Sequence, residues 1–313
     1  MHSENDNIDR ALKSLSPYLH GKERALRLAL ICFFSRGHLL IEDLPGLGKT
    51  TLAVALAKIL GLTFGRIQCT SDLLPSDITG LSIFDKNQGI FEFRPGPIFN
   101  HIVLVDEINR ATPKTQSALL EAMGEKQVTI EGRTYDLPKP FFVIATQNPI
   151  EQFGTFPLPE SQMDRFMMRI SIGYPSREAE REILRGGSKR REIYSISPIM
   201  TLDHVMATQD KIRNGVHVSE SANRMLDYLL DVIEATRTSE YLASGLSTRG
   251  ALALVTTAKA DAFFGGRDFV SPENVKAVAE YVIPHRVIFR DEYESGGKKE
   301  IIKSILASVP VPV

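Results

Sequence analysis

Residues 38–51 have the residue types that bind phosphate. Their sequence, HLLIEDLPGLGKTT, is an apolar run, a loop with two glycines and a Lys-Thr pair that opens a helical pattern. Phosphate oxygens bind well at such a loop, because successive backbone N–H groups and a helix N-terminus present partial positive charge. The residues that we predict to contact a bound phosphate ligand are Asp43, Pro45, Gly46, Leu47, Gly48, Lys49, Thr50 and Thr51.

Within this loop each residue type has its own use. Gly46 and Gly48 let the backbone approach the phosphates closely, and Lys49 can reach the β- and γ-phosphates. The Thr50 hydroxyl is a ligand for Mg²⁺. The strict P-loop pattern has a glycine five residues before Gly48, and this chain has Asp43 there. The segment predicts a site for a nucleoside triphosphate, taken as ATP, with Mg²⁺; a Gly-Lys-Thr in a surface turn is the alternative.

Two carboxylates end a second apolar run, residues 101–105. At the carboxyl edge of a parallel sheet, Asp106 can hold the water shell of Mg²⁺ and Glu107 can orient or deprotonate an attacking water. A third run, residues 141–147, ends at Asn148, whose amide could hydrogen-bond that water or the γ-phosphate. On this segment alone, an Asn-Pro turn explains Asn148 equally well. With the phosphate loop, the two carboxylates predict hydrolysis of ATP to ADP and phosphate.

Apolar runs of strand length recur through the first half of the chain. They cover residues 38–41, 64–67, 102–105, 141–145 and 166–172, and helical patterns lie between them at 49–60 and 113–123. Because the runs are apolar without alternation, they predict parallel strands that are buried on both faces. We therefore expect an α/β core with a five-stranded parallel sheet between helices.

Two segments interrupt this alternation of strand and helix. Residues 83–93 turn around an Asn-Gln-Gly sequence and residues 126–137 around a Glu-Gly pair, so both are predicted to be hairpins. The helix before the second hairpin has Thr112 as its N-cap and proline at its first position. Gly124 is expected to stand just past its end.

From residue 175 onward the pattern becomes helical, without a further convincing strand. Three helices are expected. The first follows Ser219 as its cap, the second covers residues 248–264, and the third begins at Ser271. The side chains expected on one face of the helix after Ser219 are Leu226, Leu229, Leu230 and Ile233. We predict two domains, an α/β core over 1–174 and an all-α domain over 175–313.

Composition excludes several classes of protein. The 37 basic and 38 acidic residues give a net charge of -1, so no global positive field draws the chain to nucleic acid or to an anionic membrane. Cys32 and Cys69 are too few for a disulfide framework or a four-thiolate zinc site. The polar, acidic N-terminus lacks signal-peptide features, and the apolar residues 26–34 are too short to span a bilayer. We expect a cytoplasmic protein without direct membrane insertion.

Four stretches together resemble the MoxR group of AAA+ ATPases. They are residues 40–50, 105–111, 145–149 and 157–166, and the likeness extends from about His20 to the C-terminus. The resemblance implies an AAA+ P-loop core carrying the two hairpins as inserts, followed by a C-terminal all-α lid domain. An acidic pair before the Pro-Gly of the loop is common in that group, which makes Asp43 a family trait.

The resemblance also implies roles for residues that local patterns do not assign. Asn148 becomes the sensor 1 residue, Arg165 the arginine finger offered in trans to a neighbouring subunit, and Arg249 the sensor 2 arginine. Gly21 matches a segment that lies against the adenine, and a plain turn is its alternative. Without the family resemblance, Arg165 would be interpreted as part of a surface ion pair. Arg249 would be interpreted as a solvated residue at the start of a helix.

Three further residues have two readings each. Arg110 could contact the nucleotide or the next subunit, or form a structural ion pair with a neighbouring carboxylate. Hairpins of this family often line the pore of a ring, so Phe91 and Phe93 are candidate contacts to a client; simple packing is the alternative. Which role each residue has therefore depends on where the hairpin and the carboxylates lie in the folded chain.

By resemblance, the chain is expected to be a chaperone-like ATPase that remodels or matures a protein client. The implied assembly is a homo-oligomeric ring, a hexamer, and the implied partner is a protein with a von Willebrand factor A domain. A nucleic-acid motor of the helicase-related branch is an alternative, although the near-neutral charge argues against it. A nucleotide-gated scaffold with little turnover is another, although Glu107 and Arg165 are both present.

Overall fold

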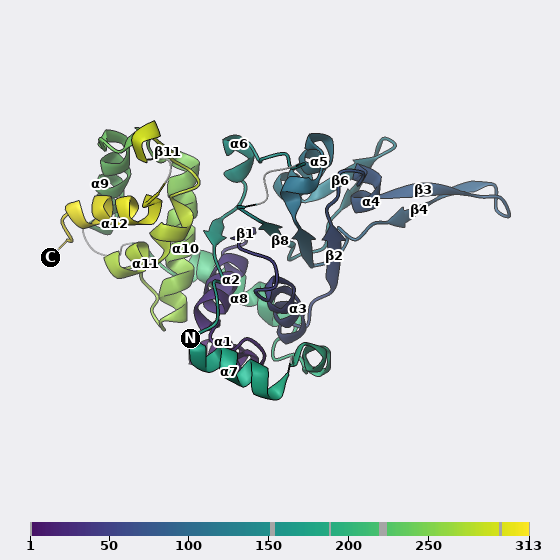
Figure 1. The fold of residues 1–313 in the computed structure, drawn as a ribbon, viewed down its shortest axis with the longest axis horizontal. Coiled ribbons are helices and arrows are strands. Elements are labelled where there is room, and N and C mark those ends of the chain that lie inside the picture. Colours follow the sequence, from purple (N-terminus) through teal and green to yellow (C-terminus); the bar gives the residue numbers. More distant parts are fainter. Residues whose placement is uncertain (1, 151–153, 188, 219–223, 294–295, 313) are drawn as a thin grey trace.

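A five-stranded parallel sheet forms the centre of the first half of the chain (Figure 1). The computed structural model describes residues 2–150, 154–187, 189–218, 224–293 and 296–312. In spatial order the strands are β2 (Phe64–Gln68), β5 (Ile102–Asp106), β8 (Phe142–Gln147), β1 (Leu39–Glu42) and β9 (Met168–Ile170). All neighbouring strands pair in parallel. The predicted sheet is confirmed.

Alternate residues of the three central strands, β1, β5 and β8, enter two different hydrophobic cores. Leu39 and Ile41 belong to the core formed with α1 (His2–Leu15), α2 (Glu23–Phe34) and α3 (Lys49–Ile59). Leu40, between them, belongs to the core formed with α4 (Pro75–Thr79) and α5 (Pro113–Glu125). Because side chains alternate across a strand, a strand buried on both faces must be apolar throughout. This explains the unbroken apolar runs.

The helix α5 begins as predicted and ends later than predicted. The Thr112 side chain accepts a hydrogen bond from the Thr115 amide and so caps the helix start. The helix continues through Gly124 to Glu125, and Lys126 ends it in the left-handed conformation with φ 56°. Gly124 has a different use: a Cβ there would stand 2.5 Å from Nη1 of Arg165. The glycine makes room for that arginine.

Both predicted hairpins are present, and they touch each other. The first pairs β3 (Gly80–Asp85) with β4 (Ile90–Pro95) and projects from the molecule (Figure 1); the second pairs β6 (Gln127–Ile130) with β7 (Arg133–Asp136). Phe93 stacks on Tyr135 with ring centroids 4.2 Å apart, so Phe93 packs between the hairpins. Phe91 is 66% exposed near the tip of the first hairpin.

The second half is mainly helical. Its helices are α7 (Arg177–Gly186), α8 (Leu202–Gly215), α9 (Arg224–Thr238), α10 (Thr248–Phe264), α11 (Pro272–Val282) and α12 (Lys298–Ser308). The bounds of α10 and the start of α11 match the predictions. Two short strands, β10 (Leu242–Ser244) and β11 (Ile288–Phe289), pair antiparallel, so the expectation of no further strand is wrong. Strands of two or three residues are too short to leave a periodic pattern.

The predicted face of α9 is also wrong in part. Leu229 is buried, but Leu226 and Leu230 are 43% and 61% exposed. The buried stripe instead contains Met225, Tyr228, Leu229, Val232 and Thr236. The leucine pattern overlooked it because the stripe includes a tyrosine and a threonine. Ser219, the expected cap, lies outside the described residues.

Short helical turns complete the described chain. They are η1 (Ser16–Tyr18), η2 (Ile108–Arg110), α6 (Glu160–Met163), η3 (Lys189–Ser195) and η4 (Asp291–Tyr293). Among the described helices, none is long and apolar enough to cross a membrane.

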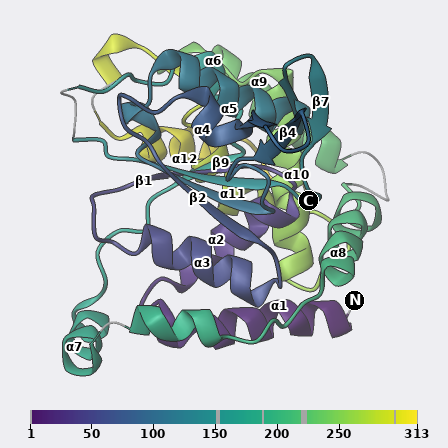
Figure 2. The ribbon, with the colours of Figure 1, turned by 90° about the vertical axis from the view of Figure 1, so that its right-hand side faces the viewer.

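One hydrophobic core joins the sheet to the helical half. Figures 1 and 2 show α10 of that half beside α2. Phe34 of α2 packs edge-on against Phe264 of α10, with ring centroids 5.9 Å apart. Polar contacts follow the same junction, because Arg27 of α2 pairs with Asp261 of α10 at 3.0 Å. The helical half therefore rests on the helix that covers the sheet. The boundary at residues 174 and 175 stays a prediction.

His38, just before β1, is held as a neutral imidazole inside the core. Its Nδ1 accepts a hydrogen bond from the Val143 amide at 3.0 Å, and its Nε2 lies 3.2 Å from the Met123 carbonyl. This pair of partners fits a ring with its proton on Nε2. Burial lowers the pKa of His38 to about 4.

We expect the free energy of unfolding to fall as the pH drops from about 6.5 to about 4, by about 1.4 kcal/mol per pH unit from His38. The unfolded chain takes up the proton near its ordinary pKa of 6.5, whereas the folded chain resists it until about 4. The stability present above pH 6.5 is therefore lost on acidification. Denaturant unfolding across this range measures the slope. In His38→Asn, which keeps an acceptor but cannot titrate, the slope should flatten; an unchanged slope would contradict this account.

Candidate nucleotide-binding site

The loop between β1 and α3 has the backbone of a phosphate cradle. Gly46 and Gly48 have φ of 84° and 93°, a region that favours glycine. No atom lies within 4 Å of a Cβ built at either position, so the loop faces open space there. Gly48 is also the N-cap of α3, whose first turn carries Lys49 and Thr50. The residues present therefore fit a phosphate group.

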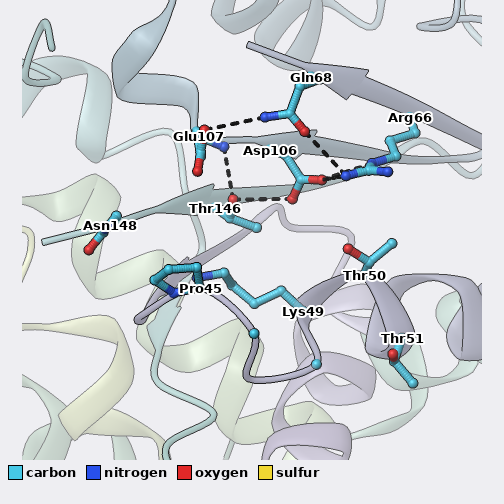
Figure 3. A pocket seen from close by; sticks show the side chains of 12 residues that line it. Pro45, Lys49, Thr50, Thr51, Arg66, Gln68, Asp106, Glu107, Thr146 and Asn148 are labelled. Atoms are coloured by element: carbon cyan, nitrogen blue, oxygen red, sulfur yellow. Dashed lines mark hydrogen bonds and ion pairs between the residues drawn. The ribbon is translucent and has the colours of Figure 1, made fainter. Parts of the chain in front are cut away.

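A cavity of about 370 Å³ opens over this loop (Figure 3). Its lining residues are Pro45, Gly46, Gly48, Lys49, Thr50, Thr51, Arg66, Gln68, Asp106, Glu107, Thr146 and Asn148. They meet because β2, β5, β8 and β1 are adjacent and parallel, so that their carboxyl ends share one edge of the sheet. Most residues predicted for the site from three separate segments therefore line one cavity.

Asp106 is held at the end of β5 by donors from both neighbouring strands. Its Oδ2 accepts from Nε and Nη2 of Arg66 at 2.9 and 2.7 Å. Its Oδ1 accepts from the Thr146 hydroxyl at 3.3 Å. That hydroxyl also accepts from the Glu107 amide at 2.9 Å, so Thr146 links the two acidic residues. The carboxylate is thus fixed at the cavity wall.

Glu107 has a strained backbone and a fixed side chain. Its φ of 57° lies in the left-handed region, which is rare for a residue with a side chain and is concentrated at functional sites. Its carboxylate accepts from Gln68 at 3.3 Å and pairs with Arg110 at 3.2 Å. The contact with Arg110 agrees with the ion-pair reading of that residue.

Lys49 and Thr50 enter the cavity from the start of α3. The Lys49 ammonium donates to the carbonyls of Asp43 and Leu44, the latter at 3.0 Å. Burial lowers the pKa of Lys49, and the nearby carboxylates of Asp106 and Glu107 act in the opposite direction. Figure 3 shows Thr50 between α3 and Asp106. The Thr50 hydroxyl and the Asp106 carboxylate supply oxygen donors, which suit Mg²⁺.

Asp43 is placed differently from the prediction that it contacts the ligand. Its carboxylate accepts from the Ser171 hydroxyl at 3.0 Å, from the Gly173 amide at 3.1 Å and from the Ile172 amide. It is 8% exposed and is not among the residues lining the cavity. The side chain therefore ties the phosphate loop to the segment after β9. Local sequence could not show this, because the partners are about 130 residues away.

A second cavity, of about 210 Å³, adjoins the loop on the side of η1. It is lined by Pro17, Tyr18, Leu19, His20, Lys22, Gly46, Leu47, Gly48, Thr51, Pro175, Ile183 and Gly187. Because it shares Gly46 and Gly48 of the loop and Thr51 of α3 with the first cavity, a ligand with its phosphates in one could extend its base into the other. Gly21 itself, with φ 68°, packs toward α7, where a Cβ would stand 3.3 Å from Cβ of Ala179.

Arg165 and Arg249 lie outside the residues that line either cavity. Nη1 of Arg165 donates to the Leu120 carbonyl of α5 at 2.8 Å. Nε of Arg249, at the start of α10, is 3.3 Å from the Asp164 carboxylate. The two arginines therefore belong to one neighbourhood, around the turn that precedes β9.

Sequence reasoning missed three residues of the cavity: Arg66, Gln68 and Thr146. Arg66 and Gln68 are alternate residues of β2, so they reach the same face of the strand. The sequence did contain a signal for these two residues, because polar residues alternate at the end of this apolar run and could therefore point to the same site. Thr146 lies in an apolar strand two positions before Asn148, and its double contact with Asp106 and Glu107 left no signal in the pattern.

Comparisons with known proteins agree with this geometry. Residues 38–168 match the profile of the ATPase family associated with various cellular activities (AAA), and residues 234–305 match the AAA lid domain. The protein YeaC of Bacillus subtilis is 42% identical over 98% of this chain and 95% of its own length. Chaperone MoxR1 of Mycobacterium tuberculosis is 37% identical over 99% of this chain and 84% of its own length.

A solved structure extends the likeness to three dimensions. A crystal structure from Cytophaga hutchinsonii, provisionally described as an ATPase, superposes with a TM-score of 0.90 at 40% identity. The superposition covers 99% of this chain and 96% of that one. The likeness of the backbone therefore includes both the sheet and the helical half.

Replacing Asp43 by glycine would restore the strict P-loop pattern, yet we expect it to destabilise the fold by about 3 kcal/mol. The change removes three hydrogen bonds to a buried carboxylate and leaves two amides without their acceptor. Thermal or denaturant unfolding measures the loss. Asp43→Asn, which keeps an acceptor oxygen but not the charge, should lose less. A glycine variant as stable as the parent would show that the tether contributes nothing.

Proposed function

This chain belongs to the MoxR family of AAA+ ATPases, and we propose on that premise that it hydrolyses ATP to drive remodelling or maturation of a protein client. The observation that carries the proposal is the meeting of Lys49, Thr50, Asp106, Glu107 and Asn148 around one cavity. A phosphate cradle, oxygen donors for Mg²⁺ and a carboxylate able to take a proton are the groups that this reaction needs.

Within one subunit, each residue has a step to perform. Lys49 and the loop amides hold the β- and γ-phosphates, while Thr50 and Asp106 would hold Mg²⁺, which when bound neutralises charge on the phosphate oxygens. Glu107 takes the proton of a water whose oxygen bonds to the γ-phosphorus. The bond from that phosphorus to the β-γ bridging oxygen breaks, so ADP and phosphate leave. Asn148 orients the water or the γ-phosphate.

The remaining cations serve a neighbouring site in this proposal. Arg165 and Arg249 flank Asp164 and do not line the cavity over their own phosphate loop. The charge that develops on the γ-phosphate needs a further cation, which a second subunit can supply. We therefore infer a ring, a hexamer by family resemblance, in which both arginines act in trans. The separation of Arg249 from its own loop supports this for the sensor 2 arginine.

The client side of the proposal rests on the first hairpin. Phe84 and Phe91 form an aromatic pair near its tip, with ring centroids 5.2 Å apart, and they are 49% and 66% exposed. Exposed aromatic side chains on a projecting element suit contact with a polypeptide. The relative from Mycobacterium tuberculosis carries the name of a chaperone. A partner with a von Willebrand factor A domain stays a proposal from family resemblance, and a cytoplasmic location stays one from the sequence.

Two substitutions separate binding from chemistry. Lys49→Ala removes the cation that meets the phosphates and should abolish ATP binding, whereas Glu107→Gln should keep ATP bound and lower kcat by about 100-fold or more. Fluorescent-nucleotide titration and phosphate release measure the two effects. Full turnover in the Glu107 variant would contradict the proposal that Glu107 is the base. The same variant, stalled with ATP, is the bait for capturing a client or partner.

Mixing variants tests the action in trans. Arg165→Ala should lower kcat by about a thousandfold with ATP binding intact, because only the cation at the neighbouring site is lost. Adding Lys49→Ala subunits, which supply an intact Arg165, should restore turnover, and Arg249→Ala should behave in the same way.

The matched control is a mixture of Lys49→Ala with Glu107→Gln. Both changes damage a subunit's own site, so this mixture should stay inactive. If the Arg165 and Lys49 variants also stay inactive together, the shared site is contradicted. Recovery for Arg165 without recovery for Arg249 would place Arg249 at its own subunit's nucleotide.

A further inference from the structure

Arg286 is a buried cation at the junction of the helical half and the sheet. It follows α11, and its side chain is 3% exposed. Burial lowers its pKa to about 10, and the Asp164 carboxylate acts in the opposite direction, so the guanidinium stays protonated at neutral pH. A buried charge needs partners, because leaving one unpaired costs several kcal/mol.

Those partners are concentrated on the turn before β9. The Nε of Arg286 donates to the Asp164 carboxylate at 2.9 Å, and its Nη2 lies 3.3 Å from the Asp164 carbonyl. The remaining donors reach the carbonyls of Phe166 and, at 3.0 Å, Met167. On its own side, Nη1 donates to the Val282 carbonyl of α11 at 2.7 Å. The planar fork of arginine thus joins α11 to three residues of one turn.

Arg165 lies within that turn, and Arg286 bonds to the residues on both sides of it but not to Arg165 itself. The backbone on both sides of Arg165 is held by Arg286, while the Arg165 side chain extends to the Leu120 carbonyl. Gly124 leaves room for it. Arg286 therefore holds the backbone from which the Arg165 side chain leaves the turn, together with His285, whose Nε2 lies 2.9 Å from the Phe166 carbonyl.

Two arginines of the helical half share Asp164, and they differ in exposure. Arg286 is buried against it, whereas Arg249 is 63% exposed at 3.3 Å. An exposed ion pair contributes little to stability, and a buried, multiply hydrogen-bonded one is costly to break. Arg249 can therefore leave Asp164 to meet a phosphate while Arg286 keeps its hold.

We propose that Arg286 is a positioning residue for hydrolysis at the neighbouring subunit, because it fixes the turn of residues 164–167 to α11 and so aims Arg165. The inference rests on the proposed function, in which Arg165 acts in trans. It adds a consequence: when the helical half of a subunit moves, Arg165 moves with it. Lysine cannot replace the fork, because a single ammonium cannot reach the carboxylate and three carbonyls in one plane.

The test is Arg286→Lys, made both in the parent chain and in Arg165→Ala. In the parent we expect kcat to fall at least tenfold, while KM for ATP changes by less than about twofold, because the subunit's own loop is untouched. In the Arg165→Ala background we expect no further fall, because the residue being aimed is already gone. Mixing Arg286→Lys with Lys49→Ala should restore turnover.

Arg27→Lys is the matched control. Arg27 also joins the two halves of the chain, through Asp261 at 3.0 Å, but it does not contact the turn of residues 164–167. It should lower the melting temperature and leave kcat unchanged. If Arg286→Lys does not fold, Asp164→Asn probes the same contact from the other side. It is made in an Arg249→Ala background, where the second partner of Asp164 is already removed, and should show the same dependence on Arg165.

Three results overturn the proposal, and they are distinguishable. If Arg286→Lys lowers kcat by the same factor with and without Arg165, or if kcat does not change in the parent, Arg286 has only a structural role, and the proposed function stands. If Arg165→Ala alone keeps full activity, the action in trans fails, and this inference fails with it.

Discussion

The parallel pairing of β1, β5 and β8 is the constraint on which the site depends. Val105 pairs with Ala145, and Glu42 pairs with Gln147, so the three strands end within one layer of the sheet edge. The phosphate loop follows the first strand, the acidic pair ends the second, and Asn148 follows the third. A shift of one residue in any strand would turn its end residue to the other face. The two cores, one on each face of the sheet, prevent that shift.

The two nearly buried carboxylates near the phosphate loop are held by several hydrogen-bond donors each. They are the carboxylates of Asp106 and Asp43. A buried carboxylate without donors would be strongly destabilising. Arg66 and Thr146 thus hold the Asp106 carboxylate in place at the cavity wall, and Asp43 ties the phosphate loop to the segment after β9.

The strand β9 joins these arrangements, because it has only three residues and is held at both ends. Before it, the turn of residues 164–167 is bound by Arg286; after it, residues 171–173 are bound by Asp43. One contact comes from the helical half and the other from the phosphate loop. The short strand therefore connects the nucleotide loop, the helical half and Arg165.

Much of this molecule could be read from its sequence. Apolar runs, glycines and caps report local backbone conformation and burial, and from them the five strands, both hairpins and the loop with Lys49 and Thr50 were predicted. Parallel topology then brought Asp106, Glu107 and Asn148 to the same edge. The buried face of α9 was misread, because tyrosine and threonine can be buried as readily as leucine when a neighbour fits them.

What only the tertiary structure decided is which distant groups the polar side chains meet. Asp43 was expected at the phosphates and instead binds residues about 130 positions away, and Arg66 reaches Asp106 from the neighbouring strand. Arg286 gave no sequence signal at all, since one arginine after a helix is usually a surface residue. The physical reason is common to all three. A pattern of residue types records what a segment does with its own backbone, whereas the partner of a buried charge depends on strand order and packing across the whole chain.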